Sequence, residues 1–296
     1  MIMGVIARYK NGNLITTLYS DGTRVRETKD DEFHPSFAEN VDVHISDRCD
    51  NNCPMCYANC TPDGAFGNLF NWEFLGSLHP GTEMALNLNF PLHPEIEKFL
   101  YFLKEKKIIV NATVNQRHFE QYEDLIKRFI DEKLIWGLGV SLYAATSEFV
   151  ERIKKYPNAV IHVINGIFTE NDLKGLTGCH LKLLILGYKD VGRGVQFHED
   201  HVSVEKNKDW LYNYIGIMLD RFDVVSFDNL ALEQLNVKRF LSDAEWEEFY
   251  GGDDGTFTFF INLPKGYFAK NSLSEVQYLI GDLTMDQMFD VIRKAG

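Results

Sequence analysis

Strand-like and helix-like segments alternate along this chain from residue 41 to residue 222. Six apolar segments have the length and composition of buried strands: VDVHIS, MALNLNF, IIVNATV, LIWGLGVSL, AVIHVING and HLKLLILGY. A helix-like segment follows each of them, from NWEFLGSL at residues 71–78 to WLYNYIGIMLDRF at residues 210–222. Such units in series form parallel sheets with right-handed crossovers. The sequence therefore predicts an α/β fold whose ligand sites lie at the carboxyl ends of the strands, whether the sheet closes or stays open.

The two ends of the chain have different patterns. Residues 1–40 contain three short strand-like runs separated by Asn11-Gly12 and Asp21-Gly22, which favour tight hairpin turns. Residues 228–296 contain a helix-like DAEWEEFY, a hairpin formed by TFTFFINL and GYFA, and a final helix in TMDQMFDVIRK. We therefore expect an N-terminal β-hairpin unit at 1–40, a main body at 41–227, and a C-terminal α+β extension at 228–296 that packs against the sheet.

Composition narrows the classes of function. The formal net charge is −13, and no run of Lys and Arg with interleaved aromatic residues is present, so bulk nucleic-acid binding is not expected. No segment has the apolar length of a transmembrane helix, and no signal peptide is recognisable. We expect a cytoplasmic protein, in which closely spaced cysteines more often bind metal than form disulfides.

Four of the five cysteines lie in CDNNCPMCYANC, directly after the first strand-like segment of the main body. A zinc site usually combines two ligand pairs separated by a dozen or more residues, and four ligands from twelve consecutive residues would crowd the backbone. The spacing also differs from a bacterial ferredoxin run. The pattern favours a [4Fe–4S] cluster held by the thiolates of Cys49, Cys53 and Cys56, with the fourth iron open. Cys60 is expected to be a free thiol, and Cys179 stands alone.

The C-x3-C-x2-C spacing, its place after the first strand, and the flanking VDVHISDRC and CPMCY resemble the radical S-adenosylmethionine (radical SAM) enzymes. That resemblance implies a partial (βα)6 TIM-type barrel at 41–227. In this family the open iron binds SAM, and reductive cleavage of SAM yields a 5′-deoxyadenosyl radical that abstracts hydrogen from the substrate. The resemblance also implies a ferredoxin- or flavodoxin-type electron donor and sensitivity to oxygen.

Further residues match positions at which the family binds SAM, although the usual Gly-Gly-Glu-Pro is replaced by LNLNFP. Residues that the resemblance makes candidates for SAM contacts are Asn87, Asn89, Asn115, Ser141, Gly187, Lys189, Arg193 and Tyr57. Simpler interpretations remain open for several of them. The two strand asparagines could be polar residues satisfied by water inside a barrel, Ser141 could cap a helix, and Lys189 and Arg193 could be solvated loop charges.

The substrate is not specified by any motif. The tail distantly resembles the auxiliary-cluster extension of peptide-modifying relatives but contains no cysteine, so a peptide or protein side chain is the first hypothesis. The same chemistry on a nucleotide or small metabolite is the second. A non-enzymatic iron–sulfur or zinc module for electron transfer or sensing is the third, and it predicts that Cys60 is a ligand.

Overall fold

The N-terminal strands form a separate small sheet in the computed structural model, which describes residues 4–295. Strands β1 (Val5–Asn11), β2 (Leu14–Tyr19) and β3 (Arg24–Thr28) are antiparallel in the order β1-β2-β3. Gly12 and Gly22 have φ angles of 62° and 93° in the two connecting turns, a conformation that glycine adopts without steric cost. Both turns lie where the Asn-Gly and Asp-Gly pairs predict them.

The remaining strands form one ten-stranded sheet with the order β10-β9-β8-β7-β6-β5-β4-β11-β12-β13. Its strands are β4 (Asn40–His44), β5 (Glu83–Asn87), β6 (Ile109–Asn115), β7 (Gly137–Ser141), β8 (Ala159–Ile164), β9 (Lys182–Leu186), β10 (Val224–Phe227), β11 (Thr258–Asn262), β12 (Tyr267–Ala269) and β13 (Tyr278–Leu279). All pairs from β10 through β11 are parallel, and only β12 and β13 are antiparallel. The prediction of an α/β fold with a large parallel sheet is confirmed.

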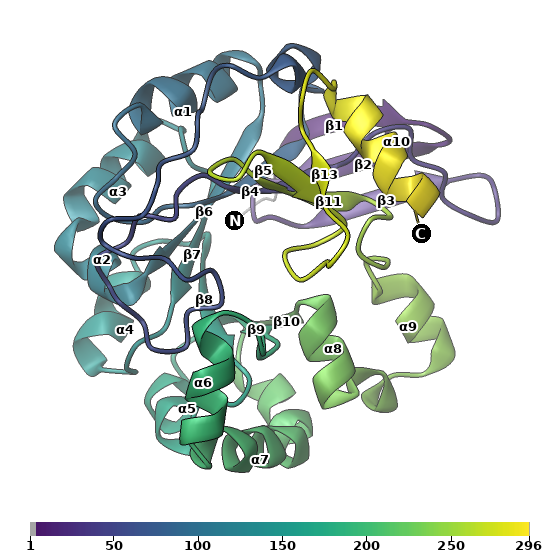
Figure 1. Ribbon diagram of the computed structural model, residues 1–296. Helices are drawn as coiled ribbons and strands as arrows, with labels where there is room; N and C mark the ends of the chain where they lie inside the picture. Colours follow the sequence, from purple (N-terminus) through teal and green to yellow (C-terminus); the bar gives the residue numbers. More distant parts are fainter. Residues whose placement is uncertain (1–3, 296) are drawn as a thin grey trace.

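Helices cover the outer face of the sheet, as Figure 1 shows for α1 through α4. The helical elements are η1 (Glu73–Ser77), α1 (Ile96–Glu105), α2 (Gln116–Gln121), α3 (Glu123–Asp131), α4 (Ser147–Ile153), α5 (Glu170–Leu176), α6 (Arg193–Asp200), α7 (Ser203–Met218), η2 (Leu219–Arg221), α8 (Asn229–Leu235), η3 (Val237–Phe240), α9 (Asp243–Phe249) and α10 (Met285–Ala295). Leu86, Val140 and Ile161 on the strands are buried with Phe99 and Phe149 on the helices. Full burial of such a side chain stabilises the fold by about 1.5–3 kcal/mol.

Strand alternation gives the sheet two unlike faces. Residues such as Met84, Leu86 and Val140 point outward and are buried, whereas their neighbours along the same strands are half-buried or exposed. Asp42 is exposed although β4 is an interior strand of the ten-stranded sheet. The inner face of the sheet is therefore accessible to solvent, and it carries polar side chains.

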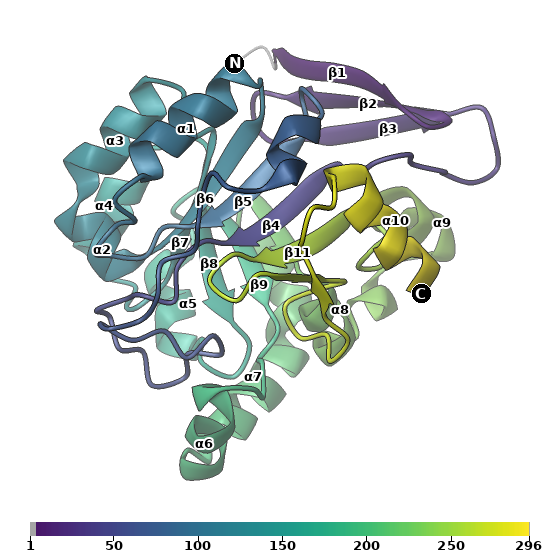
Figure 2. The ribbon, with the colours of Figure 1, turned by 45° about the horizontal axis from the view of Figure 1, so that its top comes forward.

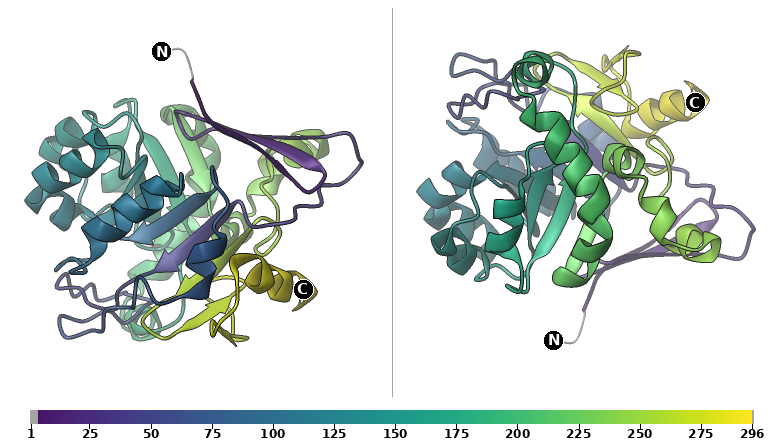
Figure 3. Two further views of the ribbon diagram at one scale, coloured as in Figure 1. Left: turned by 90° about the horizontal axis from the view of Figure 1, so that it is seen from above. Right: turned by 90° about the horizontal axis from the view of Figure 1, so that it is seen from below.

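The C-terminal segment contributes more than the sequence predicts. The β11–β12 hairpin forms as expected, but β11 also pairs in parallel with β4, from Thr258↔Asn40 to Asn262↔His44. The extension thus continues the sheet on the side of β4 away from β5, instead of only packing against it. Helix α10 then lies against η1 (Figure 3), where Ser77 Oγ accepts a hydrogen bond from the Met285 amide at 2.8 Å.

Three local predictions were inaccurate. The helix-like pattern of FEQYEDLIKRFIDEK, the segment after IIVNATV, predicts one helix at residues 119–133, but α2 ends at Gln121 and α3 begins at Glu123. Residues 71–78 form only the short 3-10 helix η1. The sequence pattern also missed β10, because VVSF is a four-residue strand at the edge of the sheet.

The small N-terminal sheet lies against the starts of the strands of the large sheet. Arg24 of β3 forms an ion pair with Glu83, the first residue of β5, and Asn158 donates a hydrogen bond to the Ser20 carbonyl at 2.8 Å. Fully buried Glu39 accepts from Arg26 at 2.7 Å. Figure 2 shows this sheet at the end of β4 opposite to the loop that follows β4.

Candidate functional site

The cysteine loop, residues 49–60, follows β4 at the carboxyl end of the parallel strands. Cys49, Cys53 and Cys56 are half-buried, Cys60 is buried, and all four are free thiols. Backbone hydrogen bonds from the Cys49 amide to the Thr61 carbonyl at 2.8 Å and from the Thr61 amide to the Asp47 carbonyl at 3.0 Å hold the loop ends together. The loop therefore brings its thiols to the end of the sheet where parallel α/β folds bind ligands.

The thiols of Cys49, Cys53 and Cys56 are close enough to interact electrostatically. The pKa of Cys53 is raised by burial and then by the Cys56 and Cys49 thiolates, and burial and Cys56 likewise raise the pKa of Cys49. One zinc ion would need sulfur atoms about 3.8 Å apart. Within residues 4–295, however, three donor atoms lie within 4.8 Å of one another only at His44, Asp47 and Cys60. The Sγ atoms of Cys49, Cys53 and Cys56 therefore do not all lie within 4.8 Å of one another.

Cys60 has a different environment from the other three cysteines. Its thiol donates a weak hydrogen bond to the Ser46 carbonyl at 3.9 Å. The neighbouring Cys60 side chain lowers the pKa of Cys56 to about 5, and Cys56 in turn raises the pKa of Cys60. His44 Nε2 lies 2.7 Å from Asp47 Oδ1 beside it. Cys60 thus belongs to a buried polar group with His44 and Asp47, and it also adjoins Cys56.

Arg193, expected from the sequence to contact SAM or an anionic substrate, instead holds the cysteine loop. Its Nε donates to the Cys53 carbonyl at 3.1 Å, and its Nη1 and Nη2 both donate to the Cys60 carbonyl at 3.0 Å. Its backbone amide donates to the Cys56 carbonyl at 3.2 Å. The Arg193 guanidinium is therefore not a solvated loop charge. Its Nε, Nη1 and Nη2 donors are used by the loop carbonyls and are not available for an anion.

A glycine makes this approach of α6 to the loop feasible. Gly192, at the N-cap of α6, has a φ angle of 59°, and a Cβ atom there would lie 2.3 Å from the Tyr57 carbonyl oxygen. Any larger residue would push α6 away from the cysteine loop. The flanking glycines in GRG were a sequence signal of close backbone packing that the motif analysis did not use.

A second contact, also missed from the sequence, ties the loop to α2. His118 Nε2 lies 2.5 Å from Asp50 Oδ1, and its Nδ1 lies 3.0 Å from the Asn51 side-chain amide. The His118 side chain is buried and Asp50 is half exposed. Helices α2 and α6 thus hold the loop from two directions, although 68 and 140 residues separate the partners.

The two strand asparagines, Asn87 and Asn89, hold the start of the loop. Asn87 Oδ1 accepts from the Ile45 amide at 2.7 Å, and its Nδ2 donates to the Ser46 carbonyl at 3.1 Å. Asn89 Nδ2 also donates to the Ser46 carbonyl, at 2.9 Å. Protein groups rather than water satisfy Asn87 on both sides, so its carbonyl oxygen is already used. Asn89 Oδ1 makes no hydrogen bond within residues 4–295.

Asn115 and Ser141 lie side by side at the carboxyl ends of β6 and β7. Asn115 caps α2 by accepting from the Arg117 amide at 2.9 Å. Ser141 caps no helix, since Thr146 is the N-cap of α4. Arg117 is exposed, stacks 3.7 Å from the centre of the Tyr143 ring, and is close enough to Cys53 to oppose the rise in its pKa. No motif in the sequence marks Arg117 as a site residue.

The remaining candidates lie after β9. Lys189 Nζ donates to Ser272 Oγ at 2.8 Å and lies 4.1 Å above the ring of Tyr57. The close approach predicted at Gly187 is present, but its partner is Leu230, whose Cγ would lie 2.3 Å from an added Cβ. Two parts of the C-terminal extension thereby reach this region: α8 contacts the strand end through Leu230, and the loop containing Ser272 contacts Lys189.

The inner face contains an acidic group and a neutral histidine. The Asp42 side chain reaches solvent, but the protein atoms that surround it on the inner face desolvate the carboxylate and raise its pKa. A hydrogen bond from Asn40 and the nearby Lys189 charge oppose the rise. Burial lowers the pKa of His162 on β8 to about 4, so its imidazole is uncharged at neutral pH. Within residues 4–295 neither ring nitrogen of His162 has a hydrogen-bond partner.

No protein-family model matches the chain, and no curated protein matches it either. Across residues 4–295, every helix is too short or too polar to pass through a membrane.

Proposed function

We propose that this chain is a radical SAM enzyme of the cytoplasm. The observation that carries the proposal is the set of three converging thiols on a loop at the carboxyl end of β4, above an accessible polar sheet face. When bound, a [4Fe–4S] cluster and SAM would supply a 5′-deoxyadenosyl radical after one-electron reduction by a ferredoxin- or flavodoxin-type donor.

In this proposal, Cys49, Cys53 and Cys56 hold the cluster as thiolates. The contacts made by Arg193 and His118 keep the loop in one conformation before the cluster binds, which lowers the entropy lost on binding. Cys60 is not a ligand, because its thiol is buried against Cys56 and the Ser46 carbonyl.

The chain offers different groups to SAM than the motif comparison alone suggests. Arg117 stacks on Tyr143 beside Cys53, forms no ion pair with any residue between 4 and 295, and suits a carboxylate. Asn89 Oδ1 suits an ammonium group, and Ser141 on the neighbouring strand end suits the ribose or carboxylate. Asn87, Asn115 and Arg193 act in this proposal as positioning residues that hold the loop or α2.

For the substrate, we propose a peptide or protein side chain. The C-terminal extension, through the contact between Ser272 and Lys189, lies beside the cysteine loop, where it can select or cover a substrate segment. The same chemistry on a nucleotide or small metabolite is the second proposal, with Lys189 as an anion contact.

The test is anaerobic reconstitution with iron and sulfide, followed by reduction with SAM and measurement of 5′-deoxyadenosine. The wild-type chain and Cys60→Ala should both bind about four irons and form 5′-deoxyadenosine. Cys53→Ala should bind less iron and form no product. Cys179→Ala serves as a matched control for removal of a thiol. Loss of the metal site in Cys60→Ala, or zinc in place of iron, would instead favour a non-enzymatic metal module using His44, Asp47 and Cys60.

A further inference from the structure

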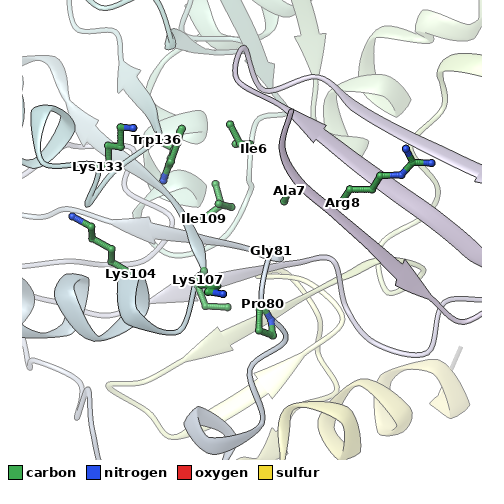
Figure 4. A pocket seen from close by; sticks show the side chains of 11 residues that line it. Ile6, Ala7, Arg8, Pro80, Gly81, Lys104, Lys107, Ile109, Lys133 and Trp136 are labelled. Atoms are coloured by element: carbon green, nitrogen blue, oxygen red, sulfur yellow. The ribbon is translucent and has the colours of Figure 1, made fainter. Parts of the chain in front are cut away.

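A basic hollow lies at the amino ends of the parallel strands, opposite to the cysteine loop. It has a volume of about 430 Å³, within the range of small-molecule sites. Its cations come from three separate segments: Arg8 from β1, Lys104 and Lys107 from the end of α1 and the turn after it, and Lys133 from the turn before β7. Figure 4 shows the three lysines gathered around Trp136 and Ile109, with Arg8 farther along the N-terminal sheet.

These four cations form no ion pair with any residue in the range 4–295, although the chain has a net charge of −13. Neighbouring acidic groups have other partners. The Glu132 carboxylate accepts from Tyr101 at 2.5 Å and lies 3.8 Å from Arg128, and only its backbone carbonyl accepts from Lys104, at 2.7 Å. The hollow is therefore a local positive region on an acidic protein, and such a region attracts anions.

A second hollow of about 270 Å³ adjoins the first, because Ile6, Ile109 and Trp136 line both. It continues between the N-terminal sheet and the strands as far as Thr113 and His162. Two glycines of β7, at 137 and 139, leave this space open, and a Cβ at position 139 would lie 2.3 Å from His162 Cε1. The inner hollow thus combines apolar walls with an uncharged imidazole, a hydroxyl and side-chain amides. The carboxylates of Asp21 and Glu83 also line it, and Glu83 is already paired with Arg24 and Asn111.

We propose that the two hollows form one binding site for a phosphorylated small molecule of nucleotide size, distinct from the site at the cysteine loop. Lysine ammonium groups bind phosphate as point charges, and Lys133 already lies 5.6 Å from the centre of the Trp136 ring. The phosphate binds among Lys104, Lys107 and Lys133, and a planar neutral part passes Trp136 toward Thr113 and His162. This inference does not depend on the proposed radical chemistry.

The site can be tested by calorimetry on the full chain at low ionic strength, with AMP and inorganic pyrophosphate as probes. Lys104→Gln/Lys133→Gln should weaken binding of both probes at least tenfold. Lys155→Gln/Lys206→Gln, which removes the same charge from exposed positions elsewhere, should change the affinity for each probe less than twofold. His162→Phe, which fills the inner hollow, should weaken the binding of AMP at least fivefold and leave the affinity for pyrophosphate unchanged.

Three results would overturn the inference. One is no binding of either probe at millimolar concentration. Another is an equal loss in both lysine pairs, which would indicate only general attraction by net charge. A third is AMP binding that the Lys104/Lys133 change leaves intact, which would place AMP elsewhere. Circular dichroism of each variant must match the wild type, and an unfolded variant is replaced by the single Lys104→Gln or Lys133→Gln change.

Discussion

Arg193 holds the cysteine loop, and its removal should loosen that loop measurably. In Arg193→Ala, the carbonyls of Cys53 and Cys60 lose a charged donor that now binds them at 3.0–3.1 Å. A hydrogen bond to a charged group contributes about 1.5–3 kcal/mol. Because the Arg193 side chain is only half-buried, the two carbonyls together should lose about 2–4 kcal/mol of local stability.

Hydrogen–deuterium exchange of the metal-free chain measures this loss directly. A loss of 2–4 kcal/mol corresponds to exchange about 30- to 1000-fold faster in residues 49–60. Arg193→Lys should fall between wild type and Arg193→Ala, because one ammonium group cannot reach both carbonyls in the same way as a planar guanidinium. Arg221→Ala, an exposed arginine outside the site, should leave loop exchange unchanged.

The reasoning would be refuted by loop exchange in Arg193→Ala equal to that of wild type. In that case the carbonyl contacts would not hold the loop, and Arg193 would again be available as an anion-binding residue. If the contacts do hold the loop, Arg193→Ala should also retain less iron after reconstitution, while Arg221→Ala retains the wild-type amount.

Two further predictions concern pH and backbone packing. His162 is neutral in the folded protein, where its pKa is about 4, but takes up a proton near pH 6.5 in the unfolded chain; the free energy of unfolding measured in urea should therefore fall by about 2–3 kcal/mol more between pH 7 and pH 4.5 in wild type than in His162→Gln. The same fall in His162→Gln as in wild type would contradict a neutral buried His162. The control is His180→Gln, which changes an exposed histidine and should behave like wild type. Gly192→Ala should destabilise the folded protein by more than the roughly 1 kcal/mol expected from its positive φ alone, because the added Cβ meets the Tyr57 carbonyl. Gly22→Ala measures the conformational cost by itself, since Gly22 has a positive φ and open space around it. Equal melting temperatures for the two variants would show that the contact with Tyr57 has no effect.

Much of the large sheet follows from local sequence. Period-two and period-3.6 patterns predicted strands β4 to β9 and most of the helices that cover them, because burial of one face imposes those periods on nearby residues. They did not predict α6, which was expected to be a loop, or the break between α2 and α3. The cysteine spacing likewise placed three candidate ligands on the loop after β4. Each of these signals lies within about a dozen consecutive residues.

Other features depend on contacts between distant segments. The parallel pairing of β11 with β4 joins residues more than 200 positions apart, and a run such as TFFIN contains no information about which strand it will pair with. The same holds for the contact of His118 with Asp50. Sequence reasoning could assign a chemical type to these residues but no partner, since the partner is set by how the helices cross the sheet.

The sequence by itself therefore determined the α/β alternation, the two N-terminal turns and the cysteine spacing, since these depend on local backbone preferences and on the burial of one face. Only the tertiary structure decided that Arg193 and Asn87 hold the loop, that Arg117 stacks on Tyr143 near it, and that the basic hollow forms at the far end of the strands. The physical reason is that a polar side chain hydrogen-bonds to whichever group folding brings within about 3 Å, and packing of the whole chain selects that group.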